Sequence, residues 1–185
     1  PAADRVAPTI RVTEERPQIQ SFIYGQFIEH LGRCIYGGIW AEMLEDRKFY
    51  FPIDADYDPY KSLEKTDFPV VGASPWQIIG DPRGVTMVTK DSFVGDQTLC
   101  IAPHCGIRQR DLGVVRDKSY QGSIWLRSTQ GTAGPIQISL ASATNAELRD
   151  THVMDEAANT WQRYEFGLTA KESSNHAMLE VQIGG

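Results

Sequence analysis

The chain has 185 residues, of which 41% are hydrophobic and 23% are charged, and its net charge at neutral pH is -6. These proportions are typical of a folded globular protein and exclude an intrinsically disordered one. The excess of acidic side chains disfavours nucleic acid and anionic lipid surfaces as partners. No apolar stretch approaches the roughly 20 residues that a membrane-spanning helix needs. The length allows one domain, or two if one of them is incomplete.

The first fifty residues predict two strands followed by a short helical segment. A short alternating strand is expected at 9–12, and a second at 21–28, whose nearly continuous apolar residues are typical of a strand covered on both faces. The second strand runs into Glu29 and His30, polar groups placed where a barrel strand opens onto its C-terminal face. One or two helical turns are then predicted from the spacing of four apolar residues, Ile39, Trp40, Met43 and Leu44.

The rest of the chain predicts antiparallel β-structure. Residues 51–74 are rich in Asp, Pro and Tyr without a sustained period, and we interpret them as a linker. After them, short alternating segments separated by turn residues predict a β-sandwich or jelly roll over 75–185. The expected strands lie at 76–79, 85–89, 99–102, 113–115 and 120–127, and around 136–140, 164–168 and 179–183. The final strand is as apolar as a central strand, which normally has a neighbour on each side. No later strand follows it, so we expect one of its edges to be open and the sandwich to be incomplete at Gly185.

The cysteines leave a disulfide open, and the spacing of possible metal ligands excludes an EF-hand and a zinc site. There are three cysteines, an odd number, and Cys100 and Cys105 could form a disulfide or remain reduced core thiols. The alternating Asp54, Asp56 and Asp58 do not start an EF-hand, because Pro59 and Lys65 stand where such a loop needs glycine and glutamate. The His and Cys residues show no zinc spacing. We expect no catalytic metal and no cofactor, while a structural calcium ion stays an open alternative.

The segment IYGQFIEHLGRCIYGGIW, from Ile23 to Trp40, closely resembles the opening of glycoside hydrolase family 51 α-L-arabinofuranosidases, and the likeness continues over 41–44 and 47–49. The resemblance implies that 21–28 is the first strand of a (β/α)8 barrel and that 9–12 joins a C-terminal β-sandwich. Residues 75–185 look like the carbohydrate-binding module of family 4 and 9 type that some members insert after this element. The looser marks of that module are Trp76, Gln97-Thr98-Leu99, Tyr120 before Ser123-Ile124-Trp125, and 160–164.

These observations together predict a mixed fold. Residues 1–50 would supply the first barrel strand and one sandwich strand, 51–74 a linker, and 75–185 an antiparallel sandwich module, with both domains incomplete in this chain. The resemblance implies a retaining exo-acting enzyme that removes arabinofuranosyl side groups from arabinoxylan or arabinan. Its partners would be an arabinose-containing plant-wall polysaccharide and the remainder of the enzyme beyond Gly185. We expect a secreted or periplasmic protein, although the start of the sequence has no features of a signal peptide.

Retaining hydrolysis needs two carboxyl groups about 5 Å apart, one as acid and base and one as nucleophile. In the family the acid and base is the glutamate of an Asn-Glu dipeptide, and none occurs here, because the three asparagines precede Ala, Thr and His. We therefore expect no catalytic residue within 1–185. Three alternatives stay open: a relative that acts on xylan or β-glucan, a non-catalytic carbohydrate-binding protein, and a sandwich that only braces the barrel.

Three residues are predicted to bind substrate. Glu29, at the expected mouth of the barrel, would accept hydrogen bonds from hydroxyls of the bound arabinofuranose, as the resemblance implies, or else be a salt-bridged structural residue. Trp40 would line the same subsite or pack beneath it. Trp125 is placed by strand alternation opposite the face of Ile124 and Leu126, where it could stack on a sugar ring or lie under a neighbouring loop.

Overall fold

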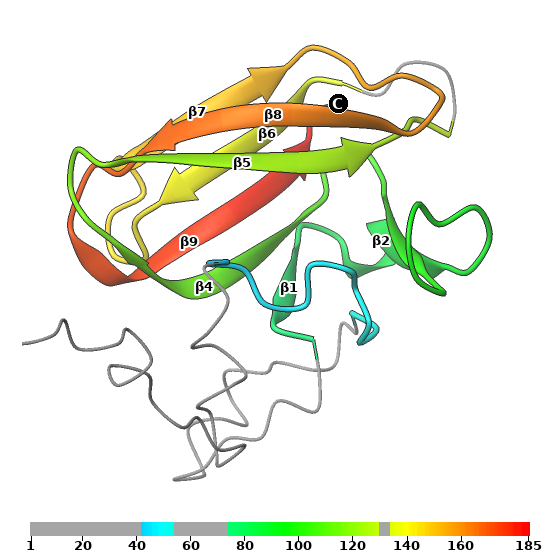
Figure 1. Ribbon diagram of the computed structural model, residues 1–185, viewed down its shortest axis with the longest axis horizontal. Coiled ribbons are helices and arrows are strands. Elements are labelled where there is room, and N and C mark those ends of the chain that lie inside the picture. Colours follow the sequence, from blue (N-terminus) through cyan, green and yellow to red (C-terminus); the bar gives the residue numbers. More distant parts are fainter. Residues whose placement is uncertain (1–41, 54–73, 130–133) are drawn as a thin grey trace, which may run out of the picture. The chain divides into compact units, whose positions relative to one another are not determined.

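The computed structural model describes residues 42–53, 74–129 and 134–185 (Figure 1). The chain divides into two compact units, Pro1–Ala41 and Glu42–Gly185, and all the described residues belong to the second. The predicted barrel strand, the strand at 9–12, Cys34, Glu29 and Trp40 lie outside the described residues, so these predictions remain as stated. Within the described ranges, the structure contains no helix that could span a membrane.

The described residues form nine β-strands, and every strand pair is antiparallel. This confirms the antiparallel β-structure predicted for 75–185. The only other regular element in the described part is a single 3-10 turn, η2 (Pro82–Gly84). The strands are β1 (Trp76–Ile79), β2 (Val85–Val88), β3 (Thr98–Ile101), β4 (Gly106–Val114), β5 (Ser119–Leu126), β6 (Ile136–Ala141), β7 (Arg149–Met154), β8 (Gln162–Thr169) and β9 (Ser174–Ile183).

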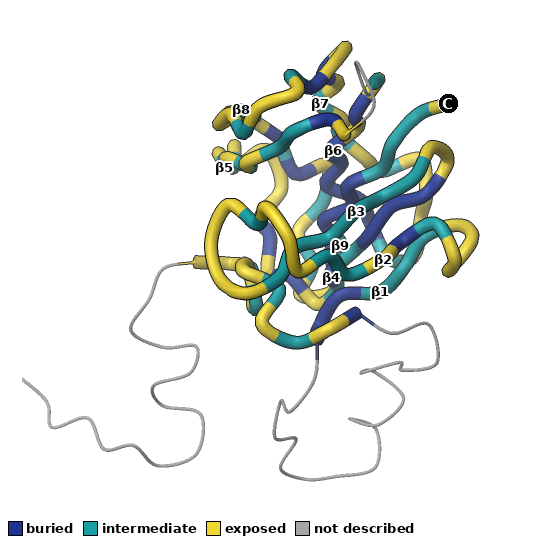
Figure 2. Tube along the Cα trace, turned by 90° about the vertical axis from the view of Figure 1, so that its right-hand side faces the viewer, coloured by how far each residue is buried: buried dark blue, intermediate teal, exposed yellow. Residues whose placement is uncertain are grey.

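The strands form a five-stranded sheet in the order β1-β4-β9-β6-β7 and two smaller pairs, β2-β3 and β5-β8. The β5-β8 pair lies as a second layer over the five-stranded sheet (Figures 1 and 2). Apolar side chains from both layers meet between them, with Ile138 fully buried on β6 and Leu168 3% exposed on β8. Burial of these apolar side chains is the main favourable term that holds the two layers together.

The final strand does not leave an open edge, contrary to the expectation from the sequence. β9 pairs with β4 on one side and with β6 on the other, with Val181 opposite both Ile107 and Ile138. Its apolar composition is that of a central strand, as predicted, but both neighbours come from earlier in the chain. The edge strands of this sheet are β1 and β7.

Residues 42–53, here called the strap, contain bends and one turn rather than the helical turns predicted around Met43 and Leu44. The buried Gln109 of β4 holds the strap through its side-chain amide, which accepts from the Glu45 N–H and donates to the Glu45 carbonyl, both at 2.9 Å. The Trp76 indole N–H donates to the Asp46 carbonyl at 3.2 Å. The strap therefore packs with the sandwich, although the sequence assigned most of it to the segment before the linker.

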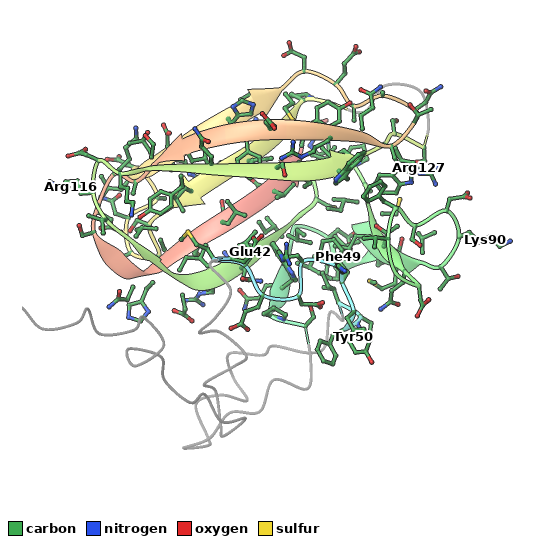
Figure 3. The ribbon with its side chains drawn as sticks, viewed as in Figure 1. Glu42, Phe49, Tyr50, Lys90, Arg116 and Arg127 are labelled. Atoms are coloured by element: carbon green, nitrogen blue, oxygen red, sulfur yellow. The ribbon has the colours of Figure 1, made fainter. Side chains whose placement is uncertain are left out.

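The turn of the strap is built around the Asp46 carboxylate. It accepts hydrogen bonds from the Tyr50 and Phe51 backbone N–H groups at 2.7 and 3.2 Å. Burial raises the pKa of Asp46 above its usual value, against the opposing effect of these two hydrogen bonds. The turn directs Phe49 toward Trp76, with ring centroids 5.8 Å apart, and leaves Tyr50 77% exposed (Figure 3).

The two cysteines of the described part are free thiols. Cys105 is buried, and its Sγ lies 3.5 Å from the carbonyl oxygen of Asp81, while Cys100 on β3 is partly buried. Of the two alternatives that the sequence left open, the structure therefore contains reduced core thiols and no disulfide between these two residues.

Asp150 of β7 links the two layers of the sandwich. Its carboxylate accepts the Thr169 backbone N–H at 2.7 Å and lies 3.0 Å from the Lys171 ammonium group. The hydrogen bond from Thr169, followed by the interaction with Lys171, lowers the pKa of Asp150 below its usual value. Because the folded-state pKa is lowered, the stabilisation is present above the unfolded pKa of about 3.9 and is lost as the pH falls through the folded-state value.

We therefore expect Asp150→Asn to lower the free energy of unfolding at pH 7 by less than about 1 kcal/mol, since solvent screens this partly exposed pair. The difference between the two proteins should shrink as the pH falls below the unfolded-state pKa of about 3.9 and through the lower pKa of the folded wild type. Urea unfolding of both proteins at pH 7 and at pH 3 measures it. A difference that does not change with pH would contradict the assigned role of the charge.

Candidate functional site

Three aromatic side chains form a cluster at one end of the β5-β8 pair, here called the aromatic patch. Phe93 comes from the loop between β2 and β3, Trp125 from the end of β5, and Trp161 from the residue that precedes β8. The rings of Phe93 and Trp125 are stacked, with centroids 3.9 Å apart and planes 18° apart. The Trp161 ring lies 5.9 Å from Phe93 and is tilted by 50°. Segments far apart in the sequence thus supply one aromatic surface.

The patch is open to solvent. Phe93 and Trp125 are 44% and 41% exposed, and Trp161 is partly buried. Alternation along β5 explains the position of Trp125, because Ile124 and Leu126 on either side of it pack against the core. A large apolar ring on the outer face of a sheet gains little from folding, so a group of such rings indicates an interaction surface.

The loop that carries Phe93 is fixed by polar contacts. The Trp161 indole N–H donates to the Asp91 carbonyl at 3.0 Å, and the Ser92 hydroxyl donates to the Gly95 carbonyl at 2.7 Å. Arg127 lies 3.7 Å from the Asp91 carboxylate and places its guanidinium group 5.5 Å from the centre of the Trp161 ring, a cation–π contact. Arg127 and Lys90 lie at the same end of the molecule, and Lys90 points outward (Figure 3). These contacts hold Phe93 against Trp125.

Hydrogen-bonding side chains border the patch along the outer face of β5 and β8, and we call Gln121, Ser123, Arg163 and Glu165 the polar strip. All four are exposed. The strand register pairs Trp125 with Arg163 and Ser123 with Glu165. The Arg163 guanidinium donates to the Glu165 carboxylate at 2.7 Å. An aromatic surface therefore adjoins a row of donors and acceptors.

Charges at the patch and the strip are balanced in pairs. Asp91 lies beside Arg127, and Glu165 lies beside Arg163. Exposed pairs of this kind contribute little to stability. They leave this part of the surface without a dominant charge, which suits a neutral ligand better than an anionic one.

Comparisons with known proteins give matches to carbohydrate-active enzymes and modules. No family model matches the chain. An extracellular exo-α-L-arabinofuranosidase of Streptomyces chartreusis is 26% identical over 166 residues, which are 88% of this chain and 18% of that protein. An intracellular exo-α-L-arabinofuranosidase of Bacteroides ovatus is 53% identical over 33 residues, which are 18% of this chain and 6% of that protein. The chain thus spans less than a fifth of the length of either relative.

Three solved structures resemble the chain at low sequence identity. A structure described as CBM4 has 18% identity and a TM-score of 0.46, and the match covers 76% of this chain and 88% of that one. TmCBM61 in complex with β-1,4-galactotriose has 16% identity and a TM-score of 0.41, with 60% and 79% covered. A family 16 carbohydrate-binding module has 12% identity and a TM-score of 0.41, with 53% and 72% covered.

Of the three residues predicted to bind substrate, only Trp125 is among the described ones. The sequence allowed Trp125 either to lie under a neighbouring loop or to be open for stacking on a sugar ring. In the structure, Phe93 of a neighbouring loop stacks on Trp125, and 41% of Trp125 stays exposed. Phe93 was not predicted as a site residue from the sequence. Its only signal was an aromatic residue in the polar loop 89–97, where no apolar period explains it.

The described residues contain no group of three or more His, Cys, Asp or Glu side chains that could hold a metal ion. The two carboxylates at the patch and strip, Asp91 and Glu165, each belong to an ion pair. The aromatic patch and the polar strip offer ring stacking and hydrogen bonding.

Proposed function

We propose that the sandwich binds a neutral plant-wall polysaccharide at the aromatic patch, as an accessory module of a retaining exo-α-L-arabinofuranosidase. The observation that carries this proposal is the exposed, stacked Trp125–Phe93 pair beside the polar strip. A sugar ring has a C–H face that packs on an aromatic ring and a rim of hydroxyl groups that need hydrogen-bond partners. The patch and the strip offer these two kinds of contact side by side.

The side chains of the strip match the hydroxyl rim of a sugar. Gln121 supplies donors and an acceptor, Ser123 a hydroxyl group, Arg163 donors and Glu165 acceptors. Because the two charged residues already pair with each other, each is held in place before a ligand arrives. Such preorganisation lowers the entropy lost on binding.

The similarity over 88% of the chain to a protein named an extracellular exo-α-L-arabinofuranosidase supports the enzymatic part of the proposal. In that setting the substrate is arabinoxylan or arabinan, and arabinofuranosyl side groups are released outside the cell or in the periplasm. Glu29 and Trp40 contact the sugar in a pocket of the barrel. The two glutamates that cleave the bond belong to barrel strands outside residues 1–185.

Replacing Trp125 by Ala is expected to weaken binding of the chain to arabinan or arabinoxylan at least about tenfold, because the stacking surface for a sugar ring is removed. Affinity electrophoresis in gels that contain arabinan, arabinoxylan, xylan or β-glucan measures the retardation and shows which polysaccharide is preferred. Tyr50→Ala is the matched control, since Tyr50 is an exposed aromatic residue of the strap and not of the patch.

Circular dichroism should show that both variants keep the wild-type fold, because neither residue lies in the core. Unchanged retardation of Trp125→Ala in every gel that retards the wild type would contradict the binding proposal. That result would favour a sandwich that only braces the catalytic domain.

A further inference from the structure

The outer face of β5 and β8 continues past the polar strip as a regular track. The strand register places four pairs in order along it, which are Trp125 with Arg163, Ser123 with Glu165, Gln121 with Gly167, and Ser119 with Thr169. Seven of these eight residues are exposed, and Thr169 is partly buried. At about 3.3 Å per residue, Trp125 and Gln121 are roughly 13 Å apart along the strand. The track is therefore longer than a single sugar ring.

Gly167 leaves a gap in this track. A Cβ atom built on Gly167 would meet no other atom within 4 Å, so a side chain would have room there. Its φ angle is not in the left-handed region, so the backbone does not require glycine. Gly122 on the inner face differs, because a Cβ there would lie 2.4 Å from the Phe166 ring. Packing explains the glycine at 122, and neither packing nor backbone conformation explains the one at 167.

A glycine inside a strand weakens the strand, and it often marks a place where a ligand approaches the backbone closely. Next to the gap, the Gln121 side chain is exposed and can both donate and accept hydrogen bonds. The arrangement suits a sugar ring that lies flat over Gly167 and hydrogen-bonds to Gln121.

We infer that the ligand is an extended oligosaccharide chain, longer than a disaccharide, that runs from Trp125 along β5 and β8 and places a sugar ring over Gly167. This inference rests on the proposed function, because it assigns the length and direction of the ligand at that same surface. Trp125 stacks on one ring, the Ser123, Arg163 and Glu165 side chains bind the hydroxyl groups of the next, and Gly167 admits the ring that follows.

The test uses Gly167→Phe, whose ring would occupy the gap, with Gly113→Phe as the matched control. Gly113 is an exposed glycine of β4 in the five-stranded sheet, and its nearest neighbour to a built Cβ is 3.8 Å away. Isothermal titration with linear arabino-oligosaccharides and xylo-oligosaccharides of increasing length gives the affinity of each variant. The wild-type affinity is expected to rise with length beyond the disaccharide.

Gly167→Phe is expected to lower the affinity for the longer oligosaccharides about tenfold and to leave that for the disaccharide unchanged, while Gly113→Phe binds as the wild type. Full affinity of Gly167→Phe for the longer oligosaccharides would overturn the inference. If Trp125→Ala still loses binding in that case, the aromatic patch remains the binding site and only the direction of the chain is wrong. If Trp125→Ala also binds normally, the proposed function fails with it.

A second variant keeps the test decisive if Gly167→Phe has a lowered melting temperature. Gln121→Ala removes the amide opposite Gly167 without adding bulk, and an exposed strand residue tolerates this change. A severalfold loss of affinity confined to the longer oligosaccharides supports the track. Wild-type affinity of Gln121→Ala at every length overturns it.

Discussion

Residues 1–185 alone are expected not to hydrolyse a chromogenic arabinofuranoside, whereas a polypeptide in which this chain is joined to a barrel with both catalytic glutamates is expected to do so. Retaining hydrolysis requires one carboxyl group to protonate the leaving oxygen and a second to attack the anomeric carbon. The 185 residues contain no Asn-Glu dipeptide, which carries the acid and base in the family that the opening motif resembles.

The expected difference is large, because general acid catalysis alone contributes about 100-fold to 10,000-fold to the rate and the nucleophile is missing as well. The measurement compares release of the chromophore by both polypeptides at equal molar concentration. A version of the longer polypeptide with the glutamate of its Asn-Glu dipeptide changed to Gln is the control for contaminating activity. Turnover by residues 1–185 at the rate of the longer form would contradict the two-glutamate argument.

Strands with clean alternation were predictable from the sequence. The segment predicted at 120–127 is observed as β5 at Ser119–Leu126, and the one at 76–79 is β1 with the same bounds. In β5 each inward residue is apolar or glycine and each outward one is polar except Trp125, so the period of two is visible. The same period predicts that the Trp125 side chain points outward.

One strand, β7, was missed, and two others, β4 and β9, were predicted only in part, with 179–183 covering the second half of β9 (Ser174–Ile183). Only the end of β4 was predicted, at 113–115, because the inward position 109 is a glutamine and two register shifts, between Gln109 and Leu112 and between Leu112 and Val114, break the alternation. β7, with the sequence RDTHVM, is a mostly polar edge strand. Edge strands often carry charged residues that block further pairing, and this hides them from a hydrophobic pattern.

The parts of the candidate site that depend on loops could not be predicted. Phe93 lies in a polar loop, and nothing local in the sequence indicates that it stacks on Trp125. The strap poses the same problem, since Gln109 and Glu45 are separated by 64 positions. Contacts of this kind depend on the finished arrangement of the sheets, and no short-range period records them.

Gln109→Ala is expected to lower the free energy of unfolding by about 2 kcal/mol, because it removes two partly buried hydrogen bonds to the backbone of Glu45, each of which contributes about 1 kcal/mol. Gln109 is 2% exposed, and its amide makes both hydrogen bonds at 2.9 Å. The lost stability should affect the strap more than the rest of the sandwich. Trp76 and Gln97 also hold the strap, through hydrogen bonds to its backbone carbonyls.

Limited proteolysis reports on the strap itself, because Arg47 and Lys48 are trypsin sites within its turn. A loss of about 2 kcal/mol raises the population of the open strap roughly thirtyfold, and cleavage there should accelerate accordingly if opening is fast relative to cleavage. Gln137→Ala, which removes an exposed glutamine from β6, is the control and should be cleaved like the wild type. Equal cleavage of all three proteins at Arg47 and Lys48 would mean that the Gln109 amide does not hold the strap, and the apolar contact of Phe49 with Trp76 would then have to account for its position.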